Sequence, residues 1–272
     1  ITFKNTTFEK DIAGSKETVN KIDINMIKNF INLFYLKNVI LSISGNININ
    51  KTKKLIHKYF NHNINYPCHK LEKFLSKDRI LYYNHIFHQK KLNSQCILRK
   101  DSQSFIGILF PSYQYNDINR FKLNIIIEIL SGYMGSVLYT ELRNKKGLIY
   151  HLHMEQENYE DFGQLIISYG TENNIHLIIQ SINIIFKELQ KLKSKINQKD
   201  FNDSKNNLIE NLKLKKNDSY WNAYSYSNDY YHQKKILSIN DIIKIYQKIN
   251  LNDLYPIIRK IFNPEYCNIC YT

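Results

Sequence analysis

Arginine, glycine, proline and cysteine are all scarce in this chain of 272 residues. Only five of its 38 basic residues are arginine, and it holds eight glycines, four prolines and four cysteines. So few cysteines at this length do not indicate a disulfide framework. Runs of about 18 apolar residues are also missing, so we expect no transmembrane segment. The chain opens on Ile1 with no signal-peptide pattern, and we expect a fragment whose beginning lies elsewhere.

The net charge of +14 raises the question of a nucleic-acid partner. Phosphate and base recognition favour the planar fork of arginine, whereas the basic residues here are mostly lysines scattered along the whole length. We therefore interpret the charge as a solvated surface and expect no nucleic-acid partner. A basic binding module is the alternative, and loss of retention on a polyanion column at low salt would remove it.

Apolar spacing predicts an α+β fold, with helices layered on one face of a mostly antiparallel sheet. A hairpin is expected from two adjacent strands joined by the polar turn at 158–161. The predicted strands are 38–45 (buried), 79–87, 94–99, 104–110 (closed by Pro111), 149–155, 163–169 and a terminal strand around 266–271. The predicted helices are 23–35, one following Asn50, 117–130, 175–192, 198–214, 219–231, 241–249 and 251–262.

The stretch LSGYMGSVLYTELRNKKGLIY, residues 130–150, is the most informative part of the sequence. It predicts a glycine-punctuated turn, a helix capped by Ser136, a left-handed stop at Gly147 and then a strand. Arg143 falls in the last helical turn and Tyr150 at the start of the strand, so both can project into one space. A fixed cation beside a phenol donor suits an oxyanion or a peptide carbonyl. The alternative is a solvated helix-end cation and a half-buried strand aromatic.

Three further groups of residues have the chemistry of a possible site. His151, His153 and Glu155 alternate along a strand and can share one face, a geometry that metal ions accept, although a polar outer face explains them too. Glu160 and Asp161 could form an acid/base pair, but a turn explains both more simply. Cys267 and Cys270 are three apart in a strand and therefore point to opposite faces, so we expect no shared metal.

With these elements placed, the chain resembles the pitrilysin/insulinase family of zinc metallopeptidases, which includes mitochondrial processing peptidase. The stretch 130–150 is similar to the family's glycine, leucine-aromatic, glutamate-leucine-arginine, glycine-leucine, tyrosine signature, and Tyr-Glu-Asp-Phe-Gly at 159–163 matches its sequel. Residues 12–14, 39–46 and 55–60 resemble the segment that follows the family's zinc-binding helices. The sequence departs at Tyr133, where a further glycine is common, and at Val137, where arginine is frequent.

The family's inverted zinc motif, His-x-x-Glu-His, is missing from this chain. Two imidazoles on one helical face, with a carboxylate beside the bound water, are what such a zinc site needs. None of the nine histidines begins or ends the motif: His57, His62, His69, His85, His88, His151, His153, His176 and His232. We therefore expect Zn²⁺ to be bound by another domain or subunit and not by this chain.

The resemblance implies that residues 1–65 end a first α+β domain, 66–78 form a linker, and 79–272 make a second, substrate-binding domain. It also implies that Arg143 and Tyr150 hold the main chain of a peptide substrate and stabilise the oxyanion. The expected protein is a zinc metalloendopeptidase, inactive in this part alone, whose partners are a peptide and the zinc-bearing half. The alternative is a non-catalytic structural subunit of a larger complex.

Overall fold

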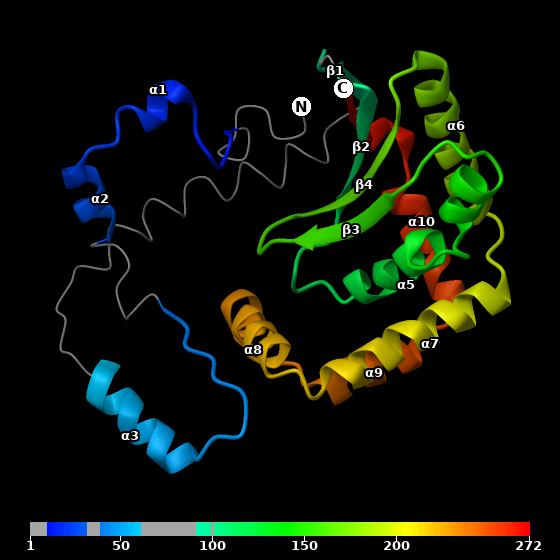
Figure 1. The fold of residues 1–272 in the computed structure, drawn as a ribbon. Coiled ribbons are helices and arrows are strands. Elements are labelled where there is room, and N and C mark those ends of the chain that lie inside the picture. Colours follow the sequence, from blue (N-terminus) through cyan, green and yellow to red (C-terminus); the bar gives the residue numbers. More distant parts are fainter. Residues whose placement is uncertain (1–9, 32–38, 61–90, 99–100) are drawn as a thin grey trace. The chain divides into compact units, whose positions relative to one another are not determined.

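The computed structural model describes residues 10–31, 39–60, 91–98 and 101–272, which fall into two compact units (Figure 1). The described part of the first unit comprises residues 91–98, 101–214 and 237–272, and that of the second comprises 10–31, 39–60 and 215–236. The predicted linker at 66–78 and the predicted strand at 79–87 lie outside the described residues. The division into domains at residues 65 and 79 stays a prediction.

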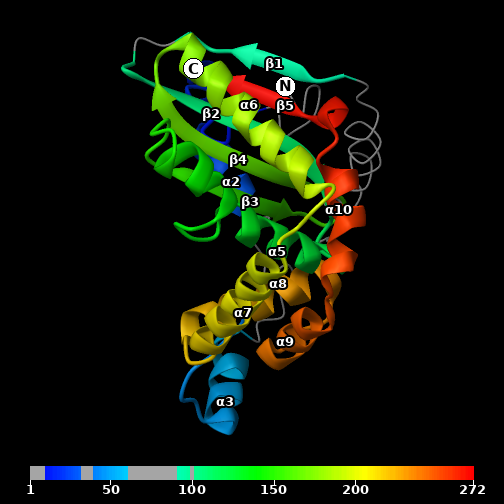
Figure 2. The ribbon, with the colours of Figure 1, turned by 90° about the vertical axis from the view of Figure 1, so that its right-hand side faces the viewer.

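The first unit is built on a five-stranded sheet of β1 (Asn93–Cys96), β2 (Gln103–Ser112), β3 (Leu152–Asn158), β4 (Gly163–Glu172) and β5 (Asn268–Tyr271). The strand order is β1-β5-β2-β4-β3, which Figure 2 shows from top to bottom. Among the described strands, only the short β1–β5 pair is parallel. The sheet is therefore mostly antiparallel, as predicted, and β3 and β4 form the predicted hairpin.

Helices cover one face of this sheet because alternate strand residues are apolar. Leu165, Ile167 and Tyr169 of β4 are buried, and Ile106, Ile108 and Phe110 of β2 are buried beside them. The α-helices of this unit are α5 (Asn119–Ser131), α6 (Ile175–Leu192), α7 (Gln198–Lys215), α9 (Ile239–Lys248) and α10 (Leu254–Ile261). The last residue of α7, Lys215, belongs to the second unit. Short 3₁₀ turns lie at Leu251–Asp253 and at Pro264–Tyr266. Of these, α5, α6 and α10 pack directly on strands. The α+β layering is thus confirmed.

An aromatic cluster joins the sheet to its helices. The Phe110 ring of β2 meets Phe186 of α6 edge-on at 6.3 Å between centroids and Phe262, just after α10, at 5.4 Å. Burying a side chain of this size contributes about 1.5–3 kcal/mol, and the edge-to-face geometry adds to it. On α6 the buried face runs through Ile178, Ser181 and Ile185, which leaves Ile179 50% exposed.

Pro111 does not close β2, contrary to prediction, since the strand continues to Ser112. Pro111 pairs with Gln164 of β4, whereas β5 pairs only with Ile106–Leu109 on the other side of β2. Beyond Leu109 one edge of β2 thus carries no described strand, and a residue without an N–H is tolerated at such an edge.

The second unit contains α1 (Lys16–Val19), α2 (Ile24–Ile31), α3 (Ile49–Phe60) and α8 (Ser219–Gln233). The expected buried strand at 38–45 is wrong over its described residues, 39–45, which form no strand and leave Val39, Leu41 and Ile43 exposed. A strand needs a neighbour to satisfy its backbone, and no strand occurs among the described residues of this unit. None of the described helices combines the length and apolarity needed to cross a membrane.

Candidate functional site

The signature stretch forms a helical turn between α5 and β3, as predicted, but its winding differs. Residues Tyr139–Asn144 form a π-helical turn, in which the Lys145 N–H donates to the Thr140 carbonyl at 3.0 Å. Leu138 and Leu142 are fully buried and hold this turn in the core. Arg143 lies in its last turn, as predicted. Single π turns of this kind are frequent at functional sites.

Gly147 ends the turn in the left-handed conformation that the sequence predicts, with φ of 62°. Its N–H donates to the Arg143 carbonyl at 2.9 Å, and the Leu148 N–H donates to the Leu142 carbonyl at 2.8 Å. These bonds satisfy carbonyls that the helix end leaves free. The chain then continues to β3, which begins at Leu152.

Ser136 is not the side-chain cap that the sequence predicts. Its backbone carbonyl accepts from the Thr140 N–H at 2.9 Å, but its hydroxyl is buried and has no hydrogen-bond partner among the described residues. The helix begins at Val137 without a side-chain cap, and the Ser136 carbonyl serves this α-type bond before the π winding starts at Tyr139.

Arg143 and Tyr150 lie side by side. The guanidinium carbon of Arg143 is 5.1 Å from the centroid of the Tyr150 ring, within the range of a cation–π interaction. Tyr150 is 81% exposed, whereas Arg143 is half-buried. Tyr150 precedes the first residue of β3 by two positions, so it belongs to the connection and not to the strand. The pair presents a permanent cation and a phenol donor on one accessible surface.

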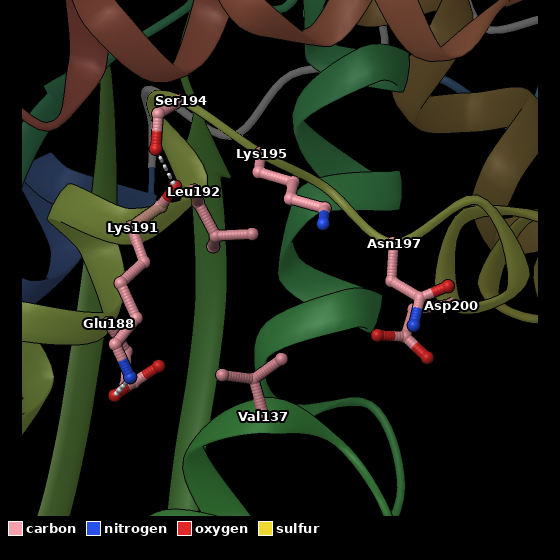
Figure 3. Close-up of a pocket in the computed structure, with 8 residues that line it drawn as sticks. All are labelled: Val137, Glu188, Lys191, Leu192, Ser194, Lys195, Asn197 and Asp200. Atoms are coloured by element: carbon pink, nitrogen blue, oxygen red, sulfur yellow. Dashed lines mark hydrogen bonds and ion pairs between the residues drawn. The ribbon is translucent and has the colours of Figure 1, made fainter.

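A cavity of about 350 Å³ lies beside the same turn (Figure 3). Val137 and Leu192 give it an apolar wall, and the Lys191 ammonium pairs with the buried Glu188 carboxylate at 2.5 Å. The other residues that line it are Ser194, Lys195, Asn197 and Asp200. Neither Arg143 nor Tyr150 lines this cavity, so the pair lies outside it.

The remaining sequence candidates form no larger constellation. His151, His153 and Glu155 are all exposed, with the Nε2 atom of His153 3.2 Å from a carboxylate oxygen of Glu155. Burial raises the pKa of the Cys267 thiol to about 12, and Cys270 is only partly buried. Glu160 and Asp161 lie in the turn between β3 and β4. Within the described ranges, no three His, Cys, Asp or Glu side chains are placed to hold a metal ion.

The loop between α5 and the π turn is shaped by Glu128 and Gly132. Gly132 has an ordinary φ of −69°, but a methyl group on it would clash with the Glu128 carboxylate. This carboxylate accepts a hydrogen bond from Asn207 of α7. Burial raises the pKa of Glu128, and the bond from Asn207 opposes that rise. The glycine therefore makes room for a carboxylate that joins α5 to α7.

We predict that Glu128→Gln makes the protein more stable at pH 7 than the wild type. Because the folded-state pKa is raised, the wild type has its full stability below the unfolded pKa and loses part of it as pH rises through the folded pKa. Glutamine keeps an acceptor for Asn207 but cannot ionise. Urea unfolding at pH 4 and pH 7 checks this: the advantage of the variant should appear only at the higher pH, and a variant less stable at pH 7 would contradict it.

The sequence does not indicate two side-chain hydrogen bonds that hold this site together. The Tyr139 hydroxyl donates to the Leu152 carbonyl at 2.9 Å, and the Thr171 hydroxyl donates to the Leu148 carbonyl at 2.7 Å. Motifs in a single sequence offer no signal for either bond, because hydroxyl-to-backbone contacts of this kind depend on how the strands are placed in space.

Comparisons with known proteins agree with this architecture. The family model described as Peptidase M16 inactive domain matches residues 21–208. Over 267 residues the chain is 22% identical to a Bacillus subtilis protein named as an uncharacterized zinc protease, YmxG, covering 97% of this chain and 61% of that protein. Over 262 residues it is 21% identical to a Helicobacter pylori protein named non-peptidase homolog YmxG, covering 94% of this chain and 57% of that protein.

A solved structure shows the same fold. The crystal structure of a protease from Helicobacter pylori aligns with a TM-score of 0.78 at 17% identity, covering 95% of this chain and 61% of that one. The chain thus spans less than two thirds of the length of these relatives. Because the family match covers more than half of the 272 residues, the chain belongs to the Peptidase M16 inactive-domain family.

Proposed function

We propose that this chain is the substrate-binding half of a zinc metalloendopeptidase of the pitrilysin/insulinase type, which cleaves peptides or presequences. The observation that carries the proposal is the Arg143–Tyr150 pair, with the guanidinium 5.1 Å from an exposed phenol ring. Support also comes from the relative named as a zinc protease. The zinc motif is absent from this sequence, so no step that passes through the metal is assigned to these residues.

Within this proposal, Arg143 and Tyr150 hold the substrate main chain at the bond to be cleaved. The guanidinium is charged at any physiological pH and can donate to a carbonyl oxygen. The Tyr150 hydroxyl supplies a second donor to an oxygen that gains negative charge during attack. Donors that are fixed before the reaction stabilise that charge without reorganising, and one such donor is worth about 3 kcal/mol of barrier.

We further propose that the expected domain order holds: residues 1–65 end a first α+β domain and 79–272 form the second. The exposure of helices α1, α2 and α3 supports a first domain, because none of their described residues is buried. On α2, Ile24, Met26 and Phe30 are each more than half exposed. An amphipathic helix normally buries such a face against a core. The remainder of a first domain would supply that core.

A reconstitution assay tests the proposed function. The chain alone, its zinc-bearing half alone, and the two together are each incubated with a quenched fluorescent peptide library. We expect hydrolysis only in the combined sample, and loss of hydrolysis on addition of a chelator. A combined sample that forms a complex, retains zinc and cleaves none of the library would contradict the proposal.

A second candidate is a non-catalytic structural subunit of a larger complex. The observation that favours it is the name of the Helicobacter pylori relative, a non-peptidase homolog. The presence of both Arg143 and Tyr150 weighs against it, since a scaffold needs neither. A complete first domain without a His-x-x-Glu-His motif in the full-length protein would favour the scaffold, and a domain with the motif would favour the peptidase.

A further inference from the structure

Tyr139 lies in the same π turn as Arg143, four residues before it, and is half-buried. Its hydroxyl donates to the Leu152 carbonyl at 2.9 Å and accepts from the Leu152 N–H at 3.4 Å. One hydroxyl therefore serves both backbone groups of the first residue of β3. The ring itself packs against the core, so the hydroxyl adds a specific tie to a contact that is otherwise apolar.

The direction of these two hydrogen bonds shows on which side of β3 the Tyr139 hydroxyl lies. In an antiparallel pair, residues alternate between turning both backbone groups toward the partner strand and turning both away. Leu152 is opposite Tyr169 of β4, yet both of its backbone groups meet Tyr139. They therefore face the outer side of β3, which is an edge strand of the described sheet. The Tyr139 hydroxyl takes the place that a neighbouring strand would occupy there.

A second hydroxyl fastens the other end of the same connection. Thr171 of β4, which is buried, donates to the Leu148 carbonyl at 2.7 Å. The connection that carries Tyr150 is thus fixed at Leu148 by the sheet and at Leu152 by the helical turn. Tyr150 lies between these two points with its side chain exposed. Arg143 belongs to the turn that carries Tyr139.

We propose that Tyr139 is a positioning residue for the Arg143–Tyr150 pair, assisted by Thr171. By bonding the turn to β3, its hydroxyl sets the separation between the guanidinium and the phenol. This inference rests on the proposed function, because positioning matters only if the pair acts on substrate. Small displacements of a group that contacts the reacting atoms cost large factors in rate, on the order of a hundredfold for 1 Å.

A double-mutant cycle in the complete peptidase, this chain with its zinc-bearing half, tests the inference. Tyr139→Phe keeps the ring and removes only the hydroxyl. The cycle combines it with Tyr150→Phe and measures kcat and KM on one peptide. We expect Tyr139→Phe to lower kcat about tenfold with KM changed less than about twofold, and to have less than about a twofold effect when Tyr150 is already phenylalanine. An additive structural defect would not show this dependence on Tyr150.

Tyr255→Phe is the matched control. The Tyr255 hydroxyl also bonds to the backbone, accepting from the Ile196 N–H at 3.3 Å, and its ring also packs against the core. We expect its removal to change the unfolding midpoint as much as Tyr139→Phe does while leaving kcat unchanged. Should Tyr139→Phe fail to fold, Thr171→Val enters the same cycle in its place.

The outcomes separate the two proposals. Suppose that Tyr150→Phe and Arg143→Ala lower activity, but that Tyr139→Phe either leaves it unchanged or lowers it equally in both backgrounds. The positioning role is then overturned, whereas the substrate clamp, meaning the Arg143–Tyr150 pair that holds the substrate, is still supported. If Tyr150→Phe and Arg143→Ala both leave turnover unchanged, the proposed substrate clamp is wrong, and the positioning role is wrong as well.

Discussion

If the proposed function is correct, replacing Arg143 with alanine is expected to lower kcat/KM of the proposed complete peptidase by about 10²–10³-fold. The guanidinium is the one permanent charge of the proposed clamp, and its partner Tyr150 is exposed beside it at 5.1 Å. Tyr150→Phe, which removes only a hydroxyl donor, should lower kcat/KM by a similar or smaller factor. Initial rates on a single fluorogenic peptide, measured below KM, give both values directly.

Arg259→Ala is the matched control for this experiment. Arg259 also lies over a tyrosine ring, that of Tyr255 at 6.0 Å, and it too occupies the last turn of a helix. Loss of a cation–π contact costs about 0.5–1 kcal/mol of stability at an exposed site, so both variants should unfold at nearly the same denaturant concentration. An equal fall in kcat/KM for both would mean that the effect of Arg143→Ala is not local to the clamp.

Gly163→Ala is expected to destabilise the first unit by about 3 kcal/mol. Gly163 opens β4 opposite Ser112, the last residue of β2. A methyl group at this position would lie far inside van der Waals contact with the backbone carbonyl of Tyr113. A backbone carbonyl cannot rotate away as a side chain can, so the hairpin end must open. The shift of the urea midpoint measures this cost.

Gly107→Ala separates that effect from the general cost of changing a strand glycine. Gly107 lies in the interior of β2, and a methyl group there would meet only the Leu109 side chain at 3.8 Å and the Cys270 carbonyl at 4.0 Å. These are ordinary contacts, so we expect a change within about 0.5 kcal/mol of the wild type. Equal destabilisation by the two substitutions would refute the close approach at Tyr113 as the cause.

The elements with long, regular apolar spacing could be predicted from the sequence. The buried positions Phe121, Ile125 and Ile129 of α5 recur every four residues, and α6 begins and ends at its predicted residues, 175 and 192. The stop at Gly147 was predictable because a left-handed residue after a helix is usually glycine. Its φ of 62° bears that out. Local chemistry was sufficient in each of these cases.

The features that could not be predicted depend on groups far apart in the chain. The apolar run at 39–45 has strand character, yet burial requires partner strands that the described part of its unit lacks. Apolar spacing does not indicate the π winding of 139–144, because the buried Leu138 and Leu142, four residues apart, fit an α-helix equally well. The hydrogen bonds between the Tyr139 hydroxyl and Leu152 depend on where β3 lies in the fold. Periodicity carries no information about such placements.

A structure of the proposed complete peptidase with an uncleaved peptide, trapped by removing the catalytic carboxylate of the proposed zinc-bearing half, tests the central claim most directly. We predict that the Arg143 guanidinium and the Tyr150 hydroxyl both lie within about 3.2 Å of the same peptide carbonyl oxygen, the range of a hydrogen bond. A peptide ordered across the active site with neither group within hydrogen-bonding distance of its main chain would contradict it.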